Sequence, residues 1–128
     1  MKKWMLIFLA ALFLTACGKD KENGQGAVYV NITAEEAKQI MDSEEGYRIL
    51  DVRTQEEYDQ GHIPGAILIP NTEIVARAET ELTDKDQLIL VYCRSGRRSK
   101  LAAEALVALG YTNIKEFGGI MDWPYEVE

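Results

Sequence analysis

This chain has few of the residues that build metal sites and disulfide frameworks. Its 128 residues include only two cysteines and one histidine. A structural zinc site needs four cysteine or histidine ligands, so this inventory excludes one. Basic residues are also scarce, because 14 lysines and arginines face 21 acidic residues and the formal net charge is −7. An acidic chain is a poor partner for the phosphates of nucleic acid, so we expect no nucleic-acid binding.

The chain also lacks an apolar run of the length that spans a bilayer. Its apolar stretch 4–16 has 13 residues and follows Lys2 and Lys3, a pattern typical of a signal peptide. The stretch ends in Leu14-Thr15-Ala16-Cys17, which resembles the lipobox of bacterial lipoproteins, in which the cysteine is lipidated and becomes the first mature residue. The alternatives are an ordinary secretory signal and a weak single membrane anchor. We predict a lipoprotein signal peptide at residues 1–16 and lipid on Cys17.

Lipidation at Cys17 has consequences for the whole chain. The signal peptide takes two lysines and no acidic residue with it, so the mature charge becomes −9. The glycine-rich polar stretch 17–26 is predicted to be a flexible tether, and the folded domain to occupy 27–128. The lipid would hold the protein on a membrane of the bacterial cell envelope, outside the cytoplasm. The anchored protein would lie either at the outer face of the cytoplasmic membrane or in the periplasm or outer membrane. Cys93 is then the one thiol left, so no intrachain disulfide can form.

The rest of the chain alternates strand and helix patterns and suits one domain. Thr33 and Thr54 are each followed three residues later by glutamate, which predicts two capped helix starts. The strands are expected at residues 27–32, 47–52, 67–69, 87–92 and 114–117, and the helices at 33–43, 54–60, 72–80 and 99–109. The stretch 87–92 is almost all apolar, as in a parallel strand buried on both faces. We therefore predict an α/β fold with a mostly parallel five-stranded sheet flanked by helices.

The chemistry is predicted to lie in Cys93-Arg94-Ser95-Gly96-Arg97-Arg98-Ser99. A short loop between a strand and a helix forms a nest of backbone N–H groups that stabilises negative charge. This nest and the three arginines should lower the pKa of a thiol at its mouth. A cysteine after an apolar strand is often only a small buried residue. Here the glycine, the arginines and the helix start coincide with it, which favours a nucleophilic sulfur that attracts a small anionic substrate.

These residues resemble the rhodanese family of sulfurtransferases. The family's Cys-Arg-x-Gly-x-Arg/Thr loop is matched by Cys93, Arg94, Gly96 and Arg98. Its other motifs are matched by Asp51-Val52-Arg53, by Glu57-Tyr58 with the segment 61–66 (GHIPGA), and by Gly118-Gly119 with Trp123. The resemblance covers about residues 28–125 and implies a single-domain rhodanese.

The resemblance implies a two-step sulfur transfer that needs no metal or organic cofactor. The Cys93 thiolate would take a sulfane sulfur from a donor such as thiosulfate and pass it, as a persulfide, to a thiol or to cyanide. Asp51 and Arg53 are expected to support the loop, Asp51 by pairing with a loop arginine or a backbone N–H and Arg53 through a salt bridge. His62 is expected to hydrogen-bond in its own loop, and Trp123 to pack in the core.

Three other functions compete with sulfur transfer. The first is a non-catalytic or sulfur-carrier binding module, against which the presence of Cys93 speaks. The second is a cysteine phosphatase, whose loops place arginine six residues after the cysteine, where this chain has Ser99. The third is a thiol redox protein, which the absence of a second nearby cysteine disfavours. The sequence leaves open the physiological donor and acceptor.

Overall fold

The computed structural model describes residues 28–128. The predicted signal peptide, Cys17 and the predicted tether lie outside the described residues. In the part that is described, none of the helices combines the length and apolar character needed to cross a membrane.

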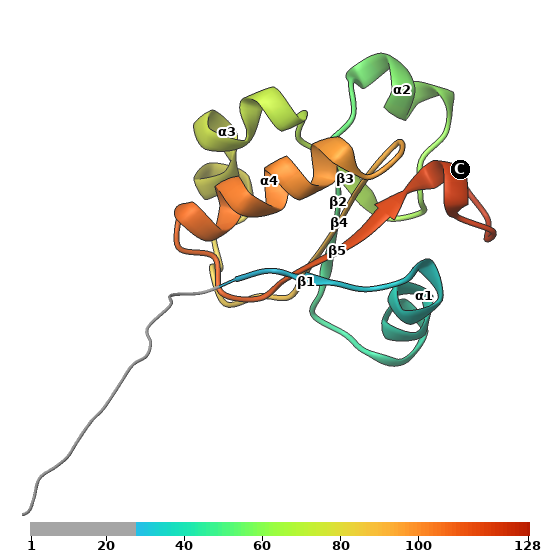
Figure 1. Cartoon of the computed structure of the whole chain (residues 1–128), viewed down its shortest axis with the longest axis horizontal. Helices are drawn as coiled ribbons and strands as arrows, with labels where there is room; N and C mark the ends of the chain where they lie inside the picture. The colour runs from blue at the N-terminus through green and yellow to red at the C-terminus, as the bar shows by residue number, and fades with distance from the viewer. Residues whose placement is uncertain (1–27) are drawn as a thin grey trace, which may run out of the picture.

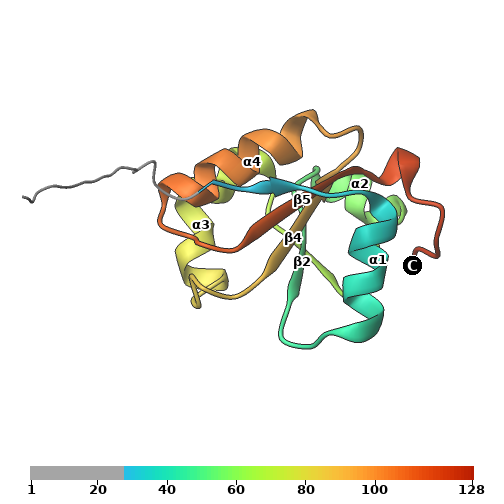
Figure 2. The same ribbon diagram turned by 60° about the horizontal axis from the view of Figure 1, so that its bottom comes forward.

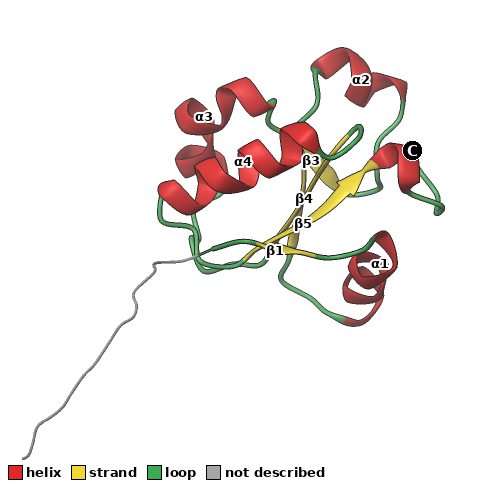
Figure 3. Cartoon of the chain, viewed as in Figure 1, coloured by secondary structure: helices red, strands yellow, loops and turns green. Residues whose placement is uncertain are grey.

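Five strands form one parallel sheet in the order β1-β5-β4-β2-β3 (Figures 1 and 3). The strands are β1 (Val30–Asn31), β2 (Arg48–Asp51), β3 (Ala66–Leu68), β4 (Ile89–Cys93) and β5 (Ile114–Gly119). Every residue of β4 is buried, as its apolar sequence predicts for the central strand of a parallel sheet. The expected α/β fold is confirmed, and the sheet is parallel throughout.

Helices connect these strands. They are α1 (Ala34–Ser43), α2 (Gln55–Gln60), α3 (Ile74–Glu81) and α4 (Arg97–Ala108), with single 3₁₀ turns at Asn71–Glu73 and Ile120–Asp122. Both predicted capping boxes are present: Thr33 accepts the N–H of Glu36, and Thr54 accepts that of Glu57. These caps satisfy N–H groups that a helix start otherwise leaves without a partner. The helix starts at Ala34 and Gln55 are therefore set by local sequence.

The sheet separates two apolar layers (Figure 2). On one face, α3 and α4 pack through small and aliphatic side chains such as Ala78 and Leu106. On the other face, α1 packs with Phe117 and Trp123. Trp123 lies 5.5 Å from Phe117, ring centre to ring centre, so its expected role in the core is confirmed. The two layers bury β4 between them, and β4 carries Cys93 at its end.

Some boundaries differ from those expected. The first strand has only two residues, because it pairs with β5 alone at the edge of the sheet. The helix expected from Ser99 begins at Arg97, since Gly96 at φ +110° supplies the turn before it. The apolar residues of this helix at 101, 102, 105, 106 and 109 predict one buried side that includes Leu101, but Leu101 is 45% exposed and Ala103 packs inward instead. The last strand runs on to Gly119, which pairs with Cys93 across a bulge.

Candidate active site

Cys93 is the last residue of the central strand β4. The loop that follows β4 leads into α4 (Figure 1). This is the edge of the sheet where the carboxyl ends of the parallel strands meet, the usual place for ligand sites on such sheets. The cysteine is 1% exposed and is a free thiol within residues 28–128. We call residues 93–99 the Cys93 loop.

Hydrogen bonds converge on the sulfur of Cys93. The N–H of Gly96 donates to Sγ at 2.9 Å, and the Ser99 hydroxyl oxygen lies 3.4 Å from Sγ. Burial raises the pKa of the Cys93 thiol. Hydrogen bonds from the Ser99 side chain and from the N–H groups of Ser99, Gly96 and Ser95 outweigh burial, so the pKa lies below its ordinary value. The predicted activation of the sulfur therefore rests mainly on the loop's own hydrogen bonds, and a thiolate nucleophile is favoured.

Two glycines allow the Cys93 loop its path. Gly96 has φ +110°, in the left-handed region that glycine adopts without strain. Gly119 lies directly against the loop, because a Cβ built there would stand 2.0 Å from the carbonyl oxygen of Arg94. The second glycine of the Gly118-Gly119 pair is thus required by close packing between β5 and the loop.

The side chain of Arg98 forms an ion pair with Glu57. Its Nη1 and Nη2 donate to the two carboxylate oxygens of Glu57 at 2.7 and 3.0 Å. The ion pair with Arg98 is the main reason that the pKa of Glu57 falls to about 2. Glu57 also closes the capping box at Thr54. The bidentate pair therefore ties the first turn of α4 to the first turn of α2, so Arg98 braces the loop.

Arg94, Ser95 and Arg97 are exposed. Arg94 lines a cleft of about 430 Å³ together with Arg53, Met121, Tyr125 and Val127. Among the described residues, neither Arg94 nor Arg97 has an ion-pair partner, unlike Arg98. These two guanidinium groups are the ones available to an anion that approaches the loop.

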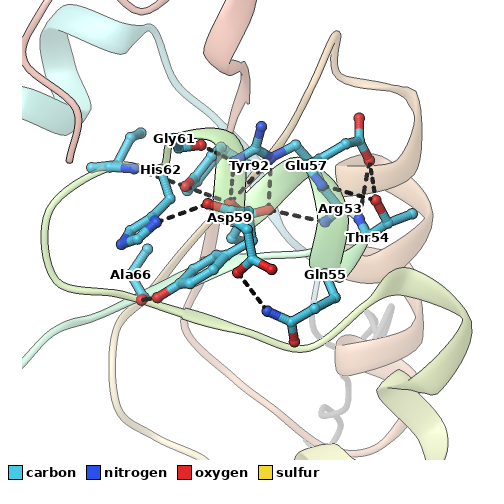
Figure 4. A network of polar contacts seen from close by, with 12 residues as sticks. Arg53, Thr54, Gln55, Glu57, Asp59, Gly61, His62, Ala66 and Tyr92 are labelled. Atoms are coloured by element: carbon cyan, nitrogen blue, oxygen red, sulfur yellow. Dashed lines mark hydrogen bonds and ion pairs between the residues drawn. The ribbon is translucent and has the colours of Figure 1, made fainter.

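Asp51 and Arg53 form a buried pair with exposures of 0% and 5%. The Arg53 guanidinium donates to both oxygens of Asp51. It also donates to the carbonyl of Gly61 at 2.7 Å (Figure 4). The Tyr92 hydroxyl donates to Asp51 at 2.7 Å and accepts the N–H of Ile63. Asp51 thus pairs with Arg53 and with the N–H of Arg53, and not with an arginine of the Cys93 loop. The network ties the 61–66 segment to the sheet beside β4.

His62 is engaged away from the sulfur. Its ring stacks on Tyr58 at 3.8 Å between centroids, and Nδ1 lies 3.0 Å from the Tyr58 carbonyl oxygen (Figure 4). Its Nε2 lies 3.4 Å from a carboxylate oxygen of Glu128. These contacts fix the conformation of the loop that contains His62, as expected from the sequence.

Sequence reasoning missed two residues of this site. The sequence patterns assign no role to Tyr92 or to Glu116. Glu116 is 1% exposed and contacts the Ser99 hydroxyl beneath Cys93. One signal was available, because alternation along the strand places Glu116 on the same side as the buried Ile114. Among residues 28–128 no group of three or more acidic, cysteine or histidine side chains is arranged to hold a metal ion.

Comparison with known proteins agrees with this geometry. Residues 33–125 match the model of the rhodanese-like domain. The chain is 42% identical to YrkF of Bacillus subtilis, which is named as a sulfur carrier protein, over 76% of this chain and 52% of the relative. The chain thus spans about half the length of that relative. It is 44% identical to the thiosulfate sulfurtransferase PspE of Escherichia coli, over 57% of this chain and 70% of the relative. A solved structure titled as a rhodanese with anions from E. coli superposes with a TM-score of 0.61 at 39% identity, covering 64% of this chain and 96% of that one.

Proposed function

The chain belongs to the family of the rhodanese-like domain, and from that premise we propose that it is a sulfurtransferase that carries a sulfane sulfur on Cys93. The donor is a small anion such as thiosulfate, and the acceptor is a thiol or, in an assay, cyanide. The observation that carries the proposal is the buried Cys93 sulfur, which accepts a backbone N–H just before the start of α4. Such a sulfur is stabilised as a thiolate and is therefore nucleophilic.

In the first step the Cys93 thiolate attacks the outer, sulfane sulfur of thiosulfate. A bond forms between Sγ and that sulfur. The bond between the two sulfur atoms of thiosulfate breaks, and sulfite leaves with its electron pair. The negative charge now lies on the outer sulfur of a Cys93 persulfide, where the N–H groups of the loop stabilise it. Arg94 and Arg97 attract the donor anion, because they are exposed and have no ion-pair partner in the described part of the chain.

In the second step an acceptor thiolate or cyanide attacks the outer sulfur. The bond from Sγ to that sulfur breaks, and Cys93 leaves as a thiolate that is stabilised by the same hydrogen bonds as before. Each step moves a neutral sulfur atom, with one bond to that sulfur formed and one broken, so neither step needs an external oxidant or reductant. We infer that the acceptor approaches through the cleft that Arg94 lines.

The test is a donor panel on the purified full chain, with the mass of the protein measured after each donor. We expect thiosulfate to add one sulfur atom to the wild-type chain and cyanide to remove it as thiocyanate. Cys93→Ser should take up no sulfur and show no transfer, while its unfolding curve stays close to that of the wild type because the replacement is nearly isosteric. Sulfur transfer by Cys93→Ser would rule the mechanism out.

A sulfur-carrier module is the second candidate, and the similarity to YrkF favours it. A carrier would accept sulfur on Cys93 but would not release it to cyanide or to small thiols. The same panel separates the two functions, since a persulfide that forms and then resists small acceptors indicates a carrier.

A further inference from the structure

The cleft beside the Cys93 loop is larger than thiosulfate or cyanide can fill. It begins at Arg94, the residue that follows Cys93. Its volume is about 430 Å³, within the range of roughly 300–1,000 Å³ that is typical of sites for organic molecules. Both small ions would leave most of this space to water. The cleft therefore offers contacts to a larger molecule that reacts at the sulfur.

One side of the cleft is apolar. We call it the apolar wall, and it consists of the five side chains of Ile120, Met121, Trp123, Tyr125 and Val127. Met121 is 62% exposed and Val127 is 49% exposed. Large apolar side chains that are so exposed beside a cleft favour a ligand that covers them with an apolar group of its own.

Backbone hydrogen bonds fix the apolar wall at both of its ends. The N–H of Met121 donates to the carbonyl oxygen of Arg94 at 3.1 Å, so one end is attached to the Cys93 loop. At the other end, the N–H of Glu128 donates to the carbonyl of His62 at 2.8 Å, and the N–H of His62 donates back at 3.0 Å. Figure 1 shows this last segment, in red, beside the loop that follows α2. The wall is therefore formed before a ligand binds.

The same cleft has one positive charge that a ligand can use. Its charged lining residues are Arg53, Glu57 and Arg94. Arg53 is paired with Asp51, and Glu57 is paired with Arg98. Arg94 has no ion-pair partner within residues 28–128. A ligand thus meets apolar surface and one unpaired guanidinium, and the best match is a molecule that has both an apolar and an anionic group.

We propose that the acceptor is an organic thiol that carries a carboxylate and an apolar group about the size of a phenyl ring. This inference rests on the proposed sulfur transfer and names the acceptor class for it. The apolar group packs on the apolar wall, and the carboxylate pairs with Arg94. The acceptor thiolate attacks the outer sulfur of the Cys93 persulfide and forms a bond to it. The bond from Sγ breaks, so Cys93 leaves as a thiolate and the acceptor becomes a persulfide anion, with charge conserved.

Three matched alkyl thiols test the acceptor class. The compound α-benzyl-β-mercaptopropionate has thiol, ring and carboxylate. β-Mercaptopropionate lacks the ring, and phenylpropanethiol, with thiol and ring at opposite ends of its chain, lacks the carboxylate. The full chain is first loaded with thiosulfate, and the loss of the added sulfur from Cys93 is followed by mass. The second-order rate constant should fall about 10-fold or more without the ring and about 2- to 5-fold without the carboxylate.

Variants assign these two effects to the cleft. Met121→Gln and Val127→Thr keep the shape of the side chains and make the wall polar. Together in one chain they should reduce the advantage of the ring about 5-fold. Val75→Thr, at an exposed position of α3 outside the cleft, is the matched control and should leave that advantage unchanged. Arg94→Ala should remove the advantage of the carboxylate and keep that of the ring. Because sulfur is loaded beforehand, effects on the donor do not enter.

Binding of phenylpropionate, which has the ring and the carboxylate but no thiol, tests the cleft without any sulfur. Saturation-transfer NMR on the unloaded full chain should show binding to the wild type and weaker binding to the Met121→Gln/Val127→Thr chain. If thiosulfate loads no sulfur onto Cys93, the proposed sulfur transfer fails, and the acceptor class fails with it. If sulfur is loaded but the three thiols react at equal rates, phenylpropionate does not bind, or Val75→Thr acts like the wall variant, the acceptor class alone is overturned.

Discussion

At the scale of single residues, the arginines around Cys93 divide into two kinds. Arg53 and Arg98 are bound to Asp51 and Glu57 by bidentate hydrogen bonds and hold the backbone in place. Arg94 and Arg97 are exposed. A small anion can form hydrogen bonds and ion pairs only with Arg94 and Arg97, because the N–H donors of the other two guanidinium groups are already bound to carboxylates. In the proposed mechanism, the charge that attracts a donor and the structure that activates the sulfur are therefore supplied by different residues.

Replacing Arg94 or Arg97 with alanine should separate these two roles. The KM for thiosulfate should rise about 2- to 5-fold, since an exposed, solvent-screened charge contributes at most about 1 kcal/mol. The pH dependence of Cys93 alkylation by neutral iodoacetamide should stay as in the wild type, because the loop N–H groups remain. Arg48→Ala, at the opposite end of β2, is the control and should leave both measurements unchanged. An alkylation midpoint shifted as strongly as KM would show that the arginines also activate the sulfur.

At the scale of secondary-structure elements, the first turns of α2 and α4 are joined through one side chain. Glu57 closes the capping box of α2 and binds Arg98 of α4. The hydrogen bonds from Arg98 hold its pKa at about 2, down from 4.5. A carboxyl whose pKa is lower in the folded state stabilises the fold above its unfolded pKa. This contribution is lost as the pH falls from 4.5 through about 2.

Glu57→Gln should reveal that contribution. Glutamine can still close the capping box, so the loss isolates the ion pair. The free energy of unfolding at pH 7 should fall by about 1–2 kcal/mol, discounted because both side chains are partly exposed. The difference from the wild type should shrink in unfolding curves measured at progressively lower pH. Glu56→Gln, in the same turn, provides the matched control with little effect. A pH-independent loss would contradict the ion-pair explanation.

The approach of β5 to the Cys93 loop predicts unequal effects at two adjacent glycines. In Gly119→Ala the new Cβ would meet the Arg94 oxygen at 2.0 Å and the Ser95 nitrogen at 2.5 Å, so the loop must move. Sulfur transfer should be largely lost. At Gly118 a Cβ finds nothing within 4 Å, and only its φ of +86° opposes alanine. Gly118→Ala should cost about 1–2 kcal/mol of stability and keep most of the transfer activity. Urea unfolding and transfer rates measure the two effects, and equal loss of activity would argue against the close approach.

At the scale of the whole molecule, the folded domain follows a segment that the sequence assigns to targeting. Residues 1–16 and Cys17 have the pattern of a lipoprotein signal. We propose that lipid on Cys17 holds the domain at a membrane of the cell envelope, outside the cytoplasm. Sulfur donors and acceptors of that compartment would then be its substrates.

Cys17→Ala should move the protein out of the membrane fraction, because the lipid would be the main anchor. The expected result is a soluble or unprocessed protein on cell fractionation. Its Cys93 should still accept sulfur from thiosulfate, since the described domain does not include Cys17. Identical fractionation of the variant and the wild type would rule lipidation out.

The sequence by itself determined the features that depend on neighbouring residues. The capping boxes at Thr33 and Thr54 need only residues three positions apart, and the buried strand β4 is read from its own apolar run. The position of Cys93 between the buried strand and the start of a helix follows from a strand, a short loop and a helix in succession. Each of these signals lies within a few residues, where backbone geometry and side-chain hydrogen bonds act directly.

The tertiary structure alone decided which distant side chains meet. Arg98 binds Glu57 across 41 residues, and Ser99 binds Glu116 across 17. Nothing in the local pattern of either segment selects its partner. The strand order places β5 beside β4 and so brings Glu116 under the Cys93 loop. Such pairs form because burial removes water from polar groups, which must then find partners within the fold.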